Sequence, residues 1–155
     1  MYEDKEILNL KEQLHSFEAR CRENGLKITP QRVAVYKALI STDTHPTAEE
    51  VQRIVTHDIH NISLDTVNRT LLTLAEIGAA FLVEGTGQPR RYDGGLDSHQ
   101  HFRCIKCGKV IDFHYEPFDN IAVPEQLHGQ FEIMRTTVYL EGICKSCQKN
   151  HNHNN

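Results

Sequence analysis

The sequence lacks both an excess of basic residues and any long apolar run. Its 155 residues include 17 Lys and Arg against 21 Asp and Glu, which gives a formal net charge of −4. This balance argues against indiscriminate polyanion binding but allows a local basic patch. No apolar run approaches the roughly 20 residues that a membrane span requires, and the charged N-terminus, Met1 to Lys11, does not resemble a secretion signal. We therefore expect a cytoplasmic protein with no membrane partner.

Cysteines are also few, yet four of the five form two Cys-x-x-Cys pairs. Cys104 and Cys107 are separated from Cys144 and Cys147 by 36 residues, positions 108–143. In a reducing compartment such pairs hold metal more often than disulfides, and four thiolates suit a tetrahedral structural Zn²⁺. The pattern predicts one zinc ion that clips the C-terminal part of the chain. The fifth, Cys21, lies on an apolar helix stripe and is interpreted as a small buried hydrophobe.

Four helices are expected in the first 80 residues. The first has an apolar stripe, spaced by three and four residues between Ile7 and Cys21, and ends near Gly25. Each of the next three begins at a hydroxyl-bearing residue that can cap a helix N-terminus. These caps are Thr29 before Pro30, Thr47 with Glu50 in a capping box, and Ser63. The fourth helix ends near Gly78.

A hairpin is predicted to follow the helices. Residues 80–83 and 90–92 flank the glycine-rich segment 85–89, and helices followed by a hairpin are typical of a winged helix-turn-helix. The fourth helix would then read base edges through its polar outer face, which comprises Asp65, Thr66, Asn68, Arg69 and Thr70. Phosphate contacts are expected from Arg20, Arg22, Lys27 and Gln31, together with Arg69. A solvated amphipathic helix without a DNA role has a similar pattern, so this alternative stays open.

The rest of the chain predicts a small α/β unit, which makes the fold class α+β. Strands are expected at 102–104, 110–113 and 137–140, and a helix at 118–128. We expect a winged-helix domain at 1–92, a hinge at 93–98 around Gly94-Gly95, a zinc-stapled dimerisation domain at 99–150 and a disordered tail at 151–155. The strand ending at Leu140 is apolar enough to pair with a partner subunit, although a buried strand of the same domain explains it equally well.

Five ordered motifs between Gly25 and Cys147 resemble the Fur (ferric uptake regulator) family. They are Lys27-Ile28-Thr29-Pro30-Gln31-Arg32, His45-Pro46-Thr47-Ala48, Ser63-Leu64-Asp65-Thr66-Val67, His99-x-His101-x-x-Cys104-x-x-Cys107-Gly108 and Cys144-x-x-Cys147. The resemblance implies a homodimer whose winged helices bind a palindromic operator DNA. It also implies that a divalent metal licenses this binding, which usually represses transcription.

The resemblance implies a second metal site made of nitrogen and oxygen donors. Its ligands would be His45, Asp93, His99, His101 and Asp112, a set that suits Fe²⁺ or Mn²⁺, with Zn²⁺ as an alternative. One ion held by these residues would fix the angle between the two domains. At positions 93 and 112 this chain has aspartates, as the peroxide-sensing members (PerR) do, whereas iron-responsive members commonly have glutamates there. The resemblance to PerR implies that peroxide and Fe²⁺ oxidise a ligand histidine, here His45 or His99, and that the protein then releases metal and DNA.

Two departures from the family pattern and three alternatives complete the prediction. Many iron-responsive members have a third metal site. At the corresponding positions of this chain only Asp119 could bind a metal, because Ser98, Gln100 and Thr136 replace other ligands. We therefore expect no third site. Asn68 stands where the family usually has tyrosine, which alters the expected operator.

The alternative functions are an iron, zinc or manganese uptake regulator, a metalloenzyme, and a zinc module that does not bind DNA. We expect neither an enzyme nor a small-molecule substrate, because no general base or substrate pocket is evident.

Overall fold

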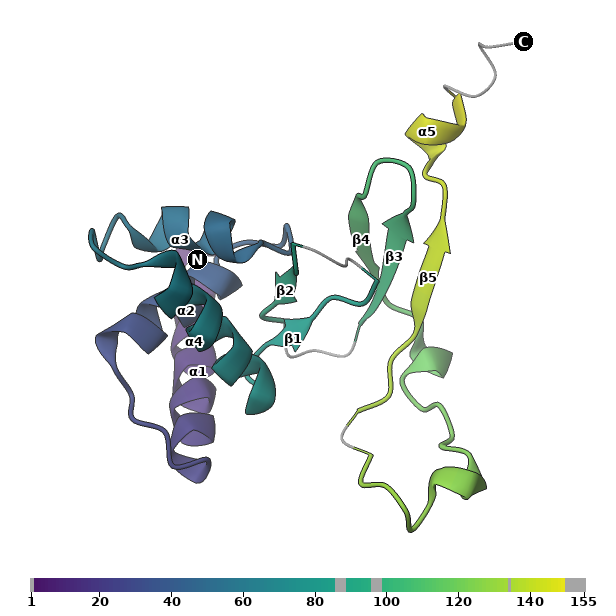
Figure 1. Cartoon of the computed structure of the whole chain (residues 1–155), viewed down its shortest axis with the longest axis horizontal. Coiled ribbons are helices and arrows are strands. Elements are labelled where there is room, and N and C mark those ends of the chain that lie inside the picture. Colours follow the sequence, from purple (N-terminus) through teal and green to yellow (C-terminus); the bar gives the residue numbers. More distant parts are fainter. Residues whose placement is uncertain (1, 86–88, 96–98, 134, 150–155) are drawn as a thin grey trace. The chain divides into compact units, whose positions relative to one another are not determined.

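The structure, a computed structural model, describes residues 2–85, 89–95, 99–133 and 135–149. The chain forms two compact units, residues 1–96 and residues 97–155, called here the N-terminal and C-terminal units (Figure 1). The N-terminal unit contains helices and a small hairpin, and the C-terminal unit contains a three-stranded sheet. The predicted α+β class is therefore confirmed. No helix in the described part of the chain is long and apolar enough to cross a membrane.

Local hydrogen bonds at their N-termini fix where three of the four N-terminal helices begin. The helices are α1 (Tyr2–Glu23), α2 (Pro30–Ile40), α3 (Ala48–Val55) and α4 (Leu64–Glu76). The hydroxyls of Thr29 and Ser63 accept the backbone N–H three residues ahead, from Arg32 and Thr66 respectively. Thr47 and Glu50 form both halves of a capping box. The three predicted caps are confirmed, because each depends on residues only three positions apart.

The core of the N-terminal unit lies among α2, α3 and α4, and the second half of α1 adds side chains to it. Phe17 stacks on Tyr36 with ring centroids 4.3 Å apart, and Cys21 is fully buried beside them, as predicted. The helix predicted from the apolar stripe is confirmed as α1, but the first half of that stripe is not buried: Ile7 and Leu10 are 53% and 40% exposed. The core includes α1 residues only from Leu14 onward, because the earlier turns of this helix do not contact the cluster of buried side chains.

The predicted hairpin is confirmed as β1 (Phe81–Leu82) paired antiparallel with β2 (Tyr92–Asp93). Residues 86–88 of its predicted tip lie outside the described residues. The loop before α3 lies along β2, where the Tyr92 N–H donates to the Pro46 carbonyl at 3.0 Å. Beyond β2, a Cβ on Gly94 would come within 2.8 Å of the Ile40 side chain, so the chain passes α2 more closely than any other residue allows.

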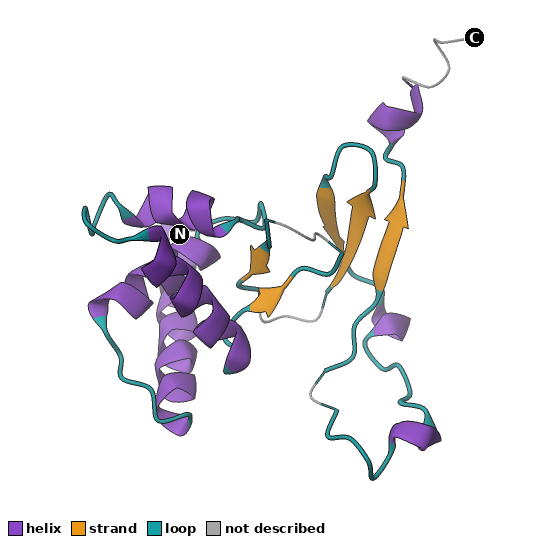
Figure 2. Ribbon diagram, viewed as in Figure 1, coloured by secondary structure: helices purple, strands orange, loops and turns teal. Residues whose placement is uncertain are grey.

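The C-terminal unit is a mixed sheet with strand order β4-β3-β5 (Figure 2). Its strands are β3 (Gln100–Cys104), β4 (Val110–Phe113) and β5 (Tyr139–Gly142). β4 is antiparallel to β3 and β5 is parallel to it. β4 has the predicted bounds, β3 begins two residues before its predicted start at 102, and β5 lies two residues after its predicted range of 137–140. A short helix, α5 (Lys145–Lys149), follows β5 and was not predicted.

The predicted helix at 118–128 is wrong. This segment contains parts of two single 3₁₀ turns, Glu116–Phe118 and Glu125–Leu127, with no hydrogen-bonded helix between them. Pro124 explains the difference, because proline lacks an N–H and disfavours helical backbone at the residue before it. The predicted tail at 151–155 lies outside the described residues.

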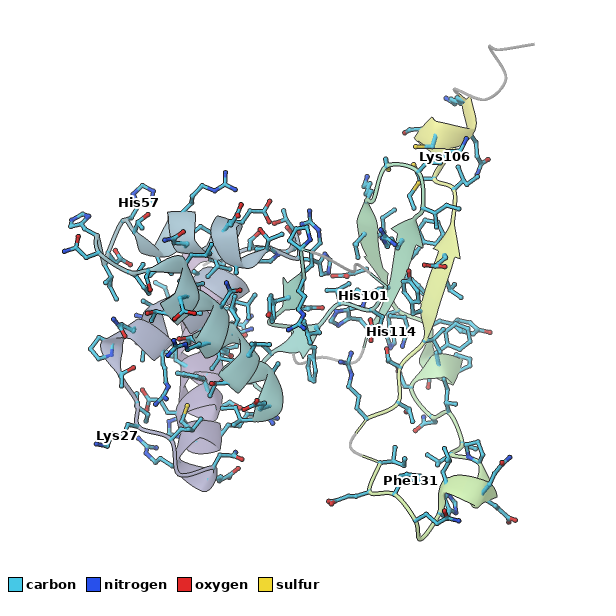
Figure 3. All side chains as sticks on the ribbon, in the orientation of Figure 1. Lys27, His57, His101, Lys106, His114 and Phe131 are labelled. Atoms are coloured by element: carbon cyan, nitrogen blue, oxygen red, sulfur yellow. The ribbon has the colours of Figure 1, made fainter. Side chains whose placement is uncertain are left out.

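The C-terminal unit buries little apolar surface in a single chain. Among its described residues, Cys104 is the only hydrophobic side chain that is buried. Phe131, in the segment between β4 and β5, is 60% exposed (Figure 3). The other large apolar side chains of the unit that are exposed are Ile105, Ile111, Tyr115, Ile121, Leu127, Ile133 and Leu140.

Candidate metal centres and DNA-binding face

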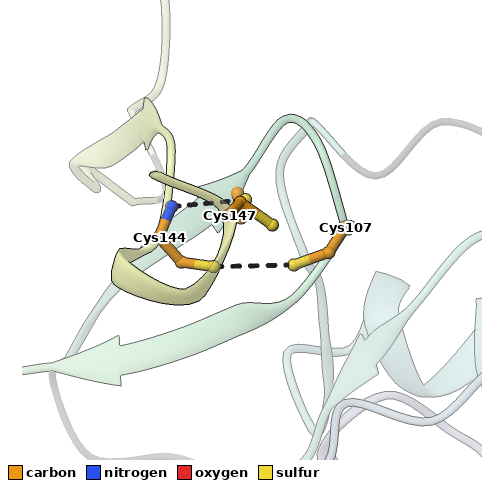
Figure 4. A group of neighbouring side chains, drawn as sticks. Cys107, Cys144 and Cys147 are labelled. Atoms are coloured by element: carbon orange, nitrogen blue, oxygen red, sulfur yellow. Dashed lines mark hydrogen bonds between the residues drawn. The ribbon is translucent and has the colours of Figure 1, made fainter. Parts of the chain in front are cut away.

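The four cysteines of the two Cys-x-x-Cys pairs meet at one end of the sheet. Cys104 ends β3, Cys107 lies in the turn before β4, and Cys144 and Cys147 lie at α5 (Figure 4). The turn is closed by a hydrogen bond from the Gly108 N–H to the Cys104 carbonyl, and Gly108 has a φ of 74° that favours glycine. The parallel pairing of β5 with β3 brings the second pair beside the first.

The geometry of this cluster fits a tetrahedral ion. The four sulfur atoms lie within 4.8 Å of one another, and the sulfurs of Cys107 and Cys144 are 3.8 Å apart. Four sulfurs at about 2.3 Å from a tetrahedral Zn²⁺ are about 3.8 Å from each other. The cluster is therefore consistent with the predicted structural zinc site.

Backbone amides favour a thiolate within this cluster. The N–H groups of Cys107 and Cys144 lower the pKa of the Cys104 thiol to about 6, and the Cys144 N–H lies 3.3 Å from its sulfur. Hydrogen bonding to the Cys144 side chain is the largest of the effects that raise the pKa of Cys147 to about 12. The Cys104 sulfur is thus readily deprotonated for binding a cation, whereas a metal must displace a proton from the Cys147 thiol.

A second group of donors lies within the C-terminal unit. His101 on β3 faces Asp112 on β4 in the strand register, and its Nε2 lies 3.2 Å from Asp112 Oδ1. His99 Nε2 lies 3.9 Å from the same oxygen, and the two imidazole rings are 4.8 Å apart. His101 is 1% exposed (Figure 3), whereas the Asp112 side chain is 42% exposed. Two imidazoles and one carboxylate thus converge, which is a donor set suited to Fe²⁺, Mn²⁺ or Zn²⁺.

A third group of donors lies within the N-terminal unit. His45 Nε2 is 3.8 Å from Asp93 Oδ2, and both side chains are largely buried. Asp93 Oδ1 accepts the Gly95 N–H at 2.7 Å, which orients the carboxylate. His45 has a φ of 54°, the left-handed conformation that non-glycine residues seldom adopt, and its carbonyl accepts a hydrogen bond from Arg91 at 3.0 Å. The sequence patterns do not single out Arg91, since its partner is a carbonyl 46 positions away.

The outer face of α4 is exposed over most of the predicted readout residues. Asn68 is exposed, and Arg69 and Asp65 form an exposed ion pair at 2.6 Å. Thr66 is half-buried and its hydroxyl contacts that of Ser63. Thr70 differs from the other readout residues, because it is buried and donates its hydroxyl to the Thr66 carbonyl, four residues back on the same helix.

The predicted phosphate-binding residues differ in exposure. Lys27 and Gln31 are exposed beside the start of α2 (Figure 3 labels Lys27). Arg22 is exposed and pairs with Glu18 at 3.4 Å. Arg20 is half-buried and donates to the Ile77 carbonyl at 3.5 Å, which ties α1 to the end of α4. Arg20 thus has a structural contact as well.

Asp119, the remaining residue of the family's third metal site, is engaged in hydrogen bonds. Gln100 Nε2 donates to its Oδ1 at 3.0 Å, and His114 Nε2 lies 2.8 Å from its Oδ2. The side-chain oxygen of Gln100, Oε1, also accepts the Tyr115 N–H at 2.9 Å. An amide and an imidazole therefore surround this carboxylate.

Comparison with known proteins agrees with this architecture. The sequence model of the Ferric uptake regulator family matches residues 23–141. The chain belongs to this family. The Peroxide-responsive repressor PerR of Staphylococcus saprophyticus is 34% identical over 143 residues, which cover 92% of this chain and 97% of that protein.

Two solved structures resemble the fold of this family member. The ferric uptake regulator Fur of Helicobacter pylori, described with three functional metal binding sites, has a TM-score of 0.69 and 27% identity, with 90% of this chain and 93% of that chain covered. The peroxide stress regulator of Campylobacter jejuni has a TM-score of 0.60 and 25% identity, with 86% and 98% covered. Both resemblances extend over both units.

Proposed function

We propose that this chain is a metal-dependent DNA-binding repressor that senses hydrogen peroxide. The observation that carries the proposal is the separation of two kinds of donor in one chain. Four thiols form one cluster, while the imidazoles and aspartates form groups without sulfur. Thiolates suit a permanent Zn²⁺, whereas imidazole and carboxylate suit an exchangeable Fe²⁺ or Mn²⁺. The name of the staphylococcal relative supports a peroxide signal.

In this proposal one ion binds His45 and Asp93 from the N-terminal unit and His99, His101 and Asp112 from the C-terminal unit. Each unit has its own donors already converged, through the His45–Asp93 and His101–Asp112 contacts. Neither group alone offers more than three side chains, so the two groups together would give the ion five protein donors. Residues 93–98 then act as the hinge, and the ion orients the winged helix for DNA.

Fe²⁺ bound there would supply the electron that cleaves the O–O bond of peroxide. An imidazole of His45 or His99 would gain one peroxide oxygen at a ring carbon, and the second oxygen would leave as water. The imidazole would supply both electrons overall, so that the iron would end as Fe²⁺. An oxidised imidazole is a poorer ligand, so metal and DNA are released. Mn²⁺ supports repression without this chemistry, which makes the manganese form insensitive.

The C-terminal unit is proposed to form a homodimer. This unit exposes more large apolar side chains, among them Ile105 and Leu140, than it buries. An exposed apolar surface of this kind marks an interaction site. Within the described residues β5 pairs only with β3, so its other edge is open to a partner strand. A two-fold dimer would present two α4 helices to the half-sites of a palindromic operator through Asp65, Asn68 and Arg69.

Operator binding before and after a pulse of peroxide tests this function. Anaerobic protein loaded with Fe²⁺ should bind its own upstream DNA in a gel shift, and peroxide should abolish that binding. The same protein loaded with Mn²⁺ should bind before and after the pulse. DNA binding that ignores the metal, or an iron form that survives peroxide, would overturn the proposal.

An iron, zinc or manganese uptake regulator is the second candidate. It is favoured by the 27% identity to the Helicobacter pylori Fur over 90% of this chain. This candidate predicts DNA binding that depends on the concentration of one metal and no oxidised histidine after peroxide treatment. Mass spectrometry of the peptides that contain His45 and His99 separates the two.

A further inference from the structure

Arg91 connects a proposed metal ligand to two elements of the winged helix. Its guanidinium donates to the His45 carbonyl at 3.0 Å, and the same nitrogen lies 3.5 Å from Glu50 Oε2. Glu50 Oε2 accepts the Thr47 N–H at 2.7 Å, which is half of the capping box of α3. Arg91 therefore joins the His45 loop to the start of α3.

The backbone of Arg91 belongs to the β1–β2 hairpin, which is the wing of the winged helix. Its carbonyl accepts the Val83 N–H at 3.0 Å, next to β1, and it forms a β-bridge with Thr47. The Arg91 side chain is 34% exposed, so the contact with His45 is partly shielded from water. Arg91 is thus a residue of the wing that contacts the capping box of α3 and the loop that carries His45.

The conformation of His45 explains why such a clamp is needed. A left-handed φ of 54° is unfavourable for a residue with a side chain, and it persists only where surrounding contacts hold it. Two successive carbonyls of this loop are held, that of His45 by the Arg91 guanidinium and that of Pro46 by the Tyr92 N–H. These contacts restrain the backbone from which the imidazole projects.

We propose that Arg91 is a positioning residue that orients His45 for the regulatory metal and links the occupied site to α3 and the wing. The inference rests on the proposed function, in which His45 is a ligand. Residues that orient a ligand typically change metal affinity about 10- to 100-fold when they are replaced. Loss of Arg91 should therefore weaken the regulatory site while the zinc site and the fold persist.

The variants Arg91→Met and Glu50→Gln separate this role from a general effect on stability. Methionine keeps an apolar stem but cannot donate to the His45 carbonyl. Glutamine at position 50 can still accept the Thr47 N–H in the capping box, so it removes only the charge opposite Arg91. Zinc content and melting temperature of each variant report whether the fold is intact.

Mn²⁺ affinity of zinc-loaded protein, measured by electron paramagnetic resonance of the free ion, is the main readout. We expect Arg91→Met to bind Mn²⁺ at least about tenfold more weakly, Arg91→Lys to recover part of the loss, and Glu50→Gln to stay near wild type. In the His45→Ala background, Arg91→Met should have no further effect, because coupled residues are not additive. An Mn²⁺ affinity unchanged by Arg91→Met, or an equal loss with and without His45, would overturn the inference.

The proposed function fails by a different result. If wild-type protein bound operator equally with and without Mn²⁺, the metal-dependent repressor would be wrong whatever Arg91 does. If wild type requires Mn²⁺ and Arg91→Met matches it in Mn²⁺ affinity, only the role of Arg91 is refuted.

Discussion

His101 and Asp112 face each other across β3 and β4, with Nε2 and Oδ1 3.2 Å apart. One residue is almost fully buried and the other is 42% exposed. The strand register therefore presents a fixed imidazole and an accessible carboxylate at one place. The length of the Asp112 side chain therefore sets where its carboxylate lies relative to His101 when an ion is bound.

Asp112→Glu should keep metal-dependent DNA binding but slow the oxidation of a histidine by peroxide. The added methylene moves the carboxylate relative to His101, which changes the geometry at which Fe²⁺ is held without removing a donor. The measurement is the rate at which the His45 or His99 peptide gains one oxygen atom in the iron-loaded protein. Asp119→Glu is the matched control, because Asp119 contacts Gln100 and His114 and is not one of the five donors of the proposed site. Equal oxidation rates for wild type and Asp112→Glu would contradict this prediction.

His45→Ala should abolish metal-dependent operator binding and leave zinc and the dimer intact. It removes one proposed regulatory ligand from the N-terminal unit, whereas all four thiols lie in the C-terminal unit. Gel shifts with saturating Mn²⁺, together with zinc analysis and size-exclusion chromatography, check this. His57→Ala is the control, since His57 is an exposed histidine just after α3. Wild-type operator affinity in His45→Ala would refute the bridging ion.

Cys104→Ser should lose zinc and dissociate the dimer. Serine is a poor zinc ligand, and Cys104 both ends β3 and accepts the Cys144 N–H, so its loss disturbs the junction of β3 and β5. Metal analysis and size-exclusion chromatography measure the two effects. Cys21→Ala removes a buried thiol outside the cluster and should keep a full complement of zinc. A zinc-bound dimer of Cys104→Ser would exclude the structural role.

Asn68→Ala should weaken binding to the operator by about 1–3 kcal/mol if the amide contacts a base. Asn68 is exposed on α4, and an Asn amide can pair with adenine through two hydrogen bonds. Titration against the operator and against a scrambled duplex of equal length shows whether the loss is specific. Glu76→Ala, at the end of the same helix, should leave the preference for the operator unchanged. A uniform loss on both duplexes would assign Asn68 to backbone contact instead.

The features that sequence predicted best are those determined within a few residues. The caps at Thr29, Thr47 and Ser63 each depend on a hydrogen bond over three positions, and each is present. The spacing of the two cysteine pairs is typical of metal binding, and the four sulfurs converge. Such local chemistry is independent of the remainder of the fold.

The features that sequence could not predict depend on distant contacts. The stripe of α1 has the same spacing at Ile7 as at Phe17, yet only Phe17 finds an aromatic partner, on α2. The hydroxyl of Thr70 looks available in sequence but turns back onto its own helix. The contact of Arg91 with the His45 carbonyl spans 46 positions and follows no pattern. Which side chains are accessible is decided by packing.

The parallel pairing of β3 with β5 also determines the order in which the C-terminal unit can fold. β3 and β4 are joined by a short turn and can pair early, whereas β5 must return across residues 114–138 before its ladder forms. Closing such a long connection is entropically costly and slow. Because the two cysteine pairs lie at the ends of β3 and β5, a zinc ion held first by Cys104 and Cys107 would capture the returning strand. Metal supply during synthesis would then set how fast the unit reaches its native topology.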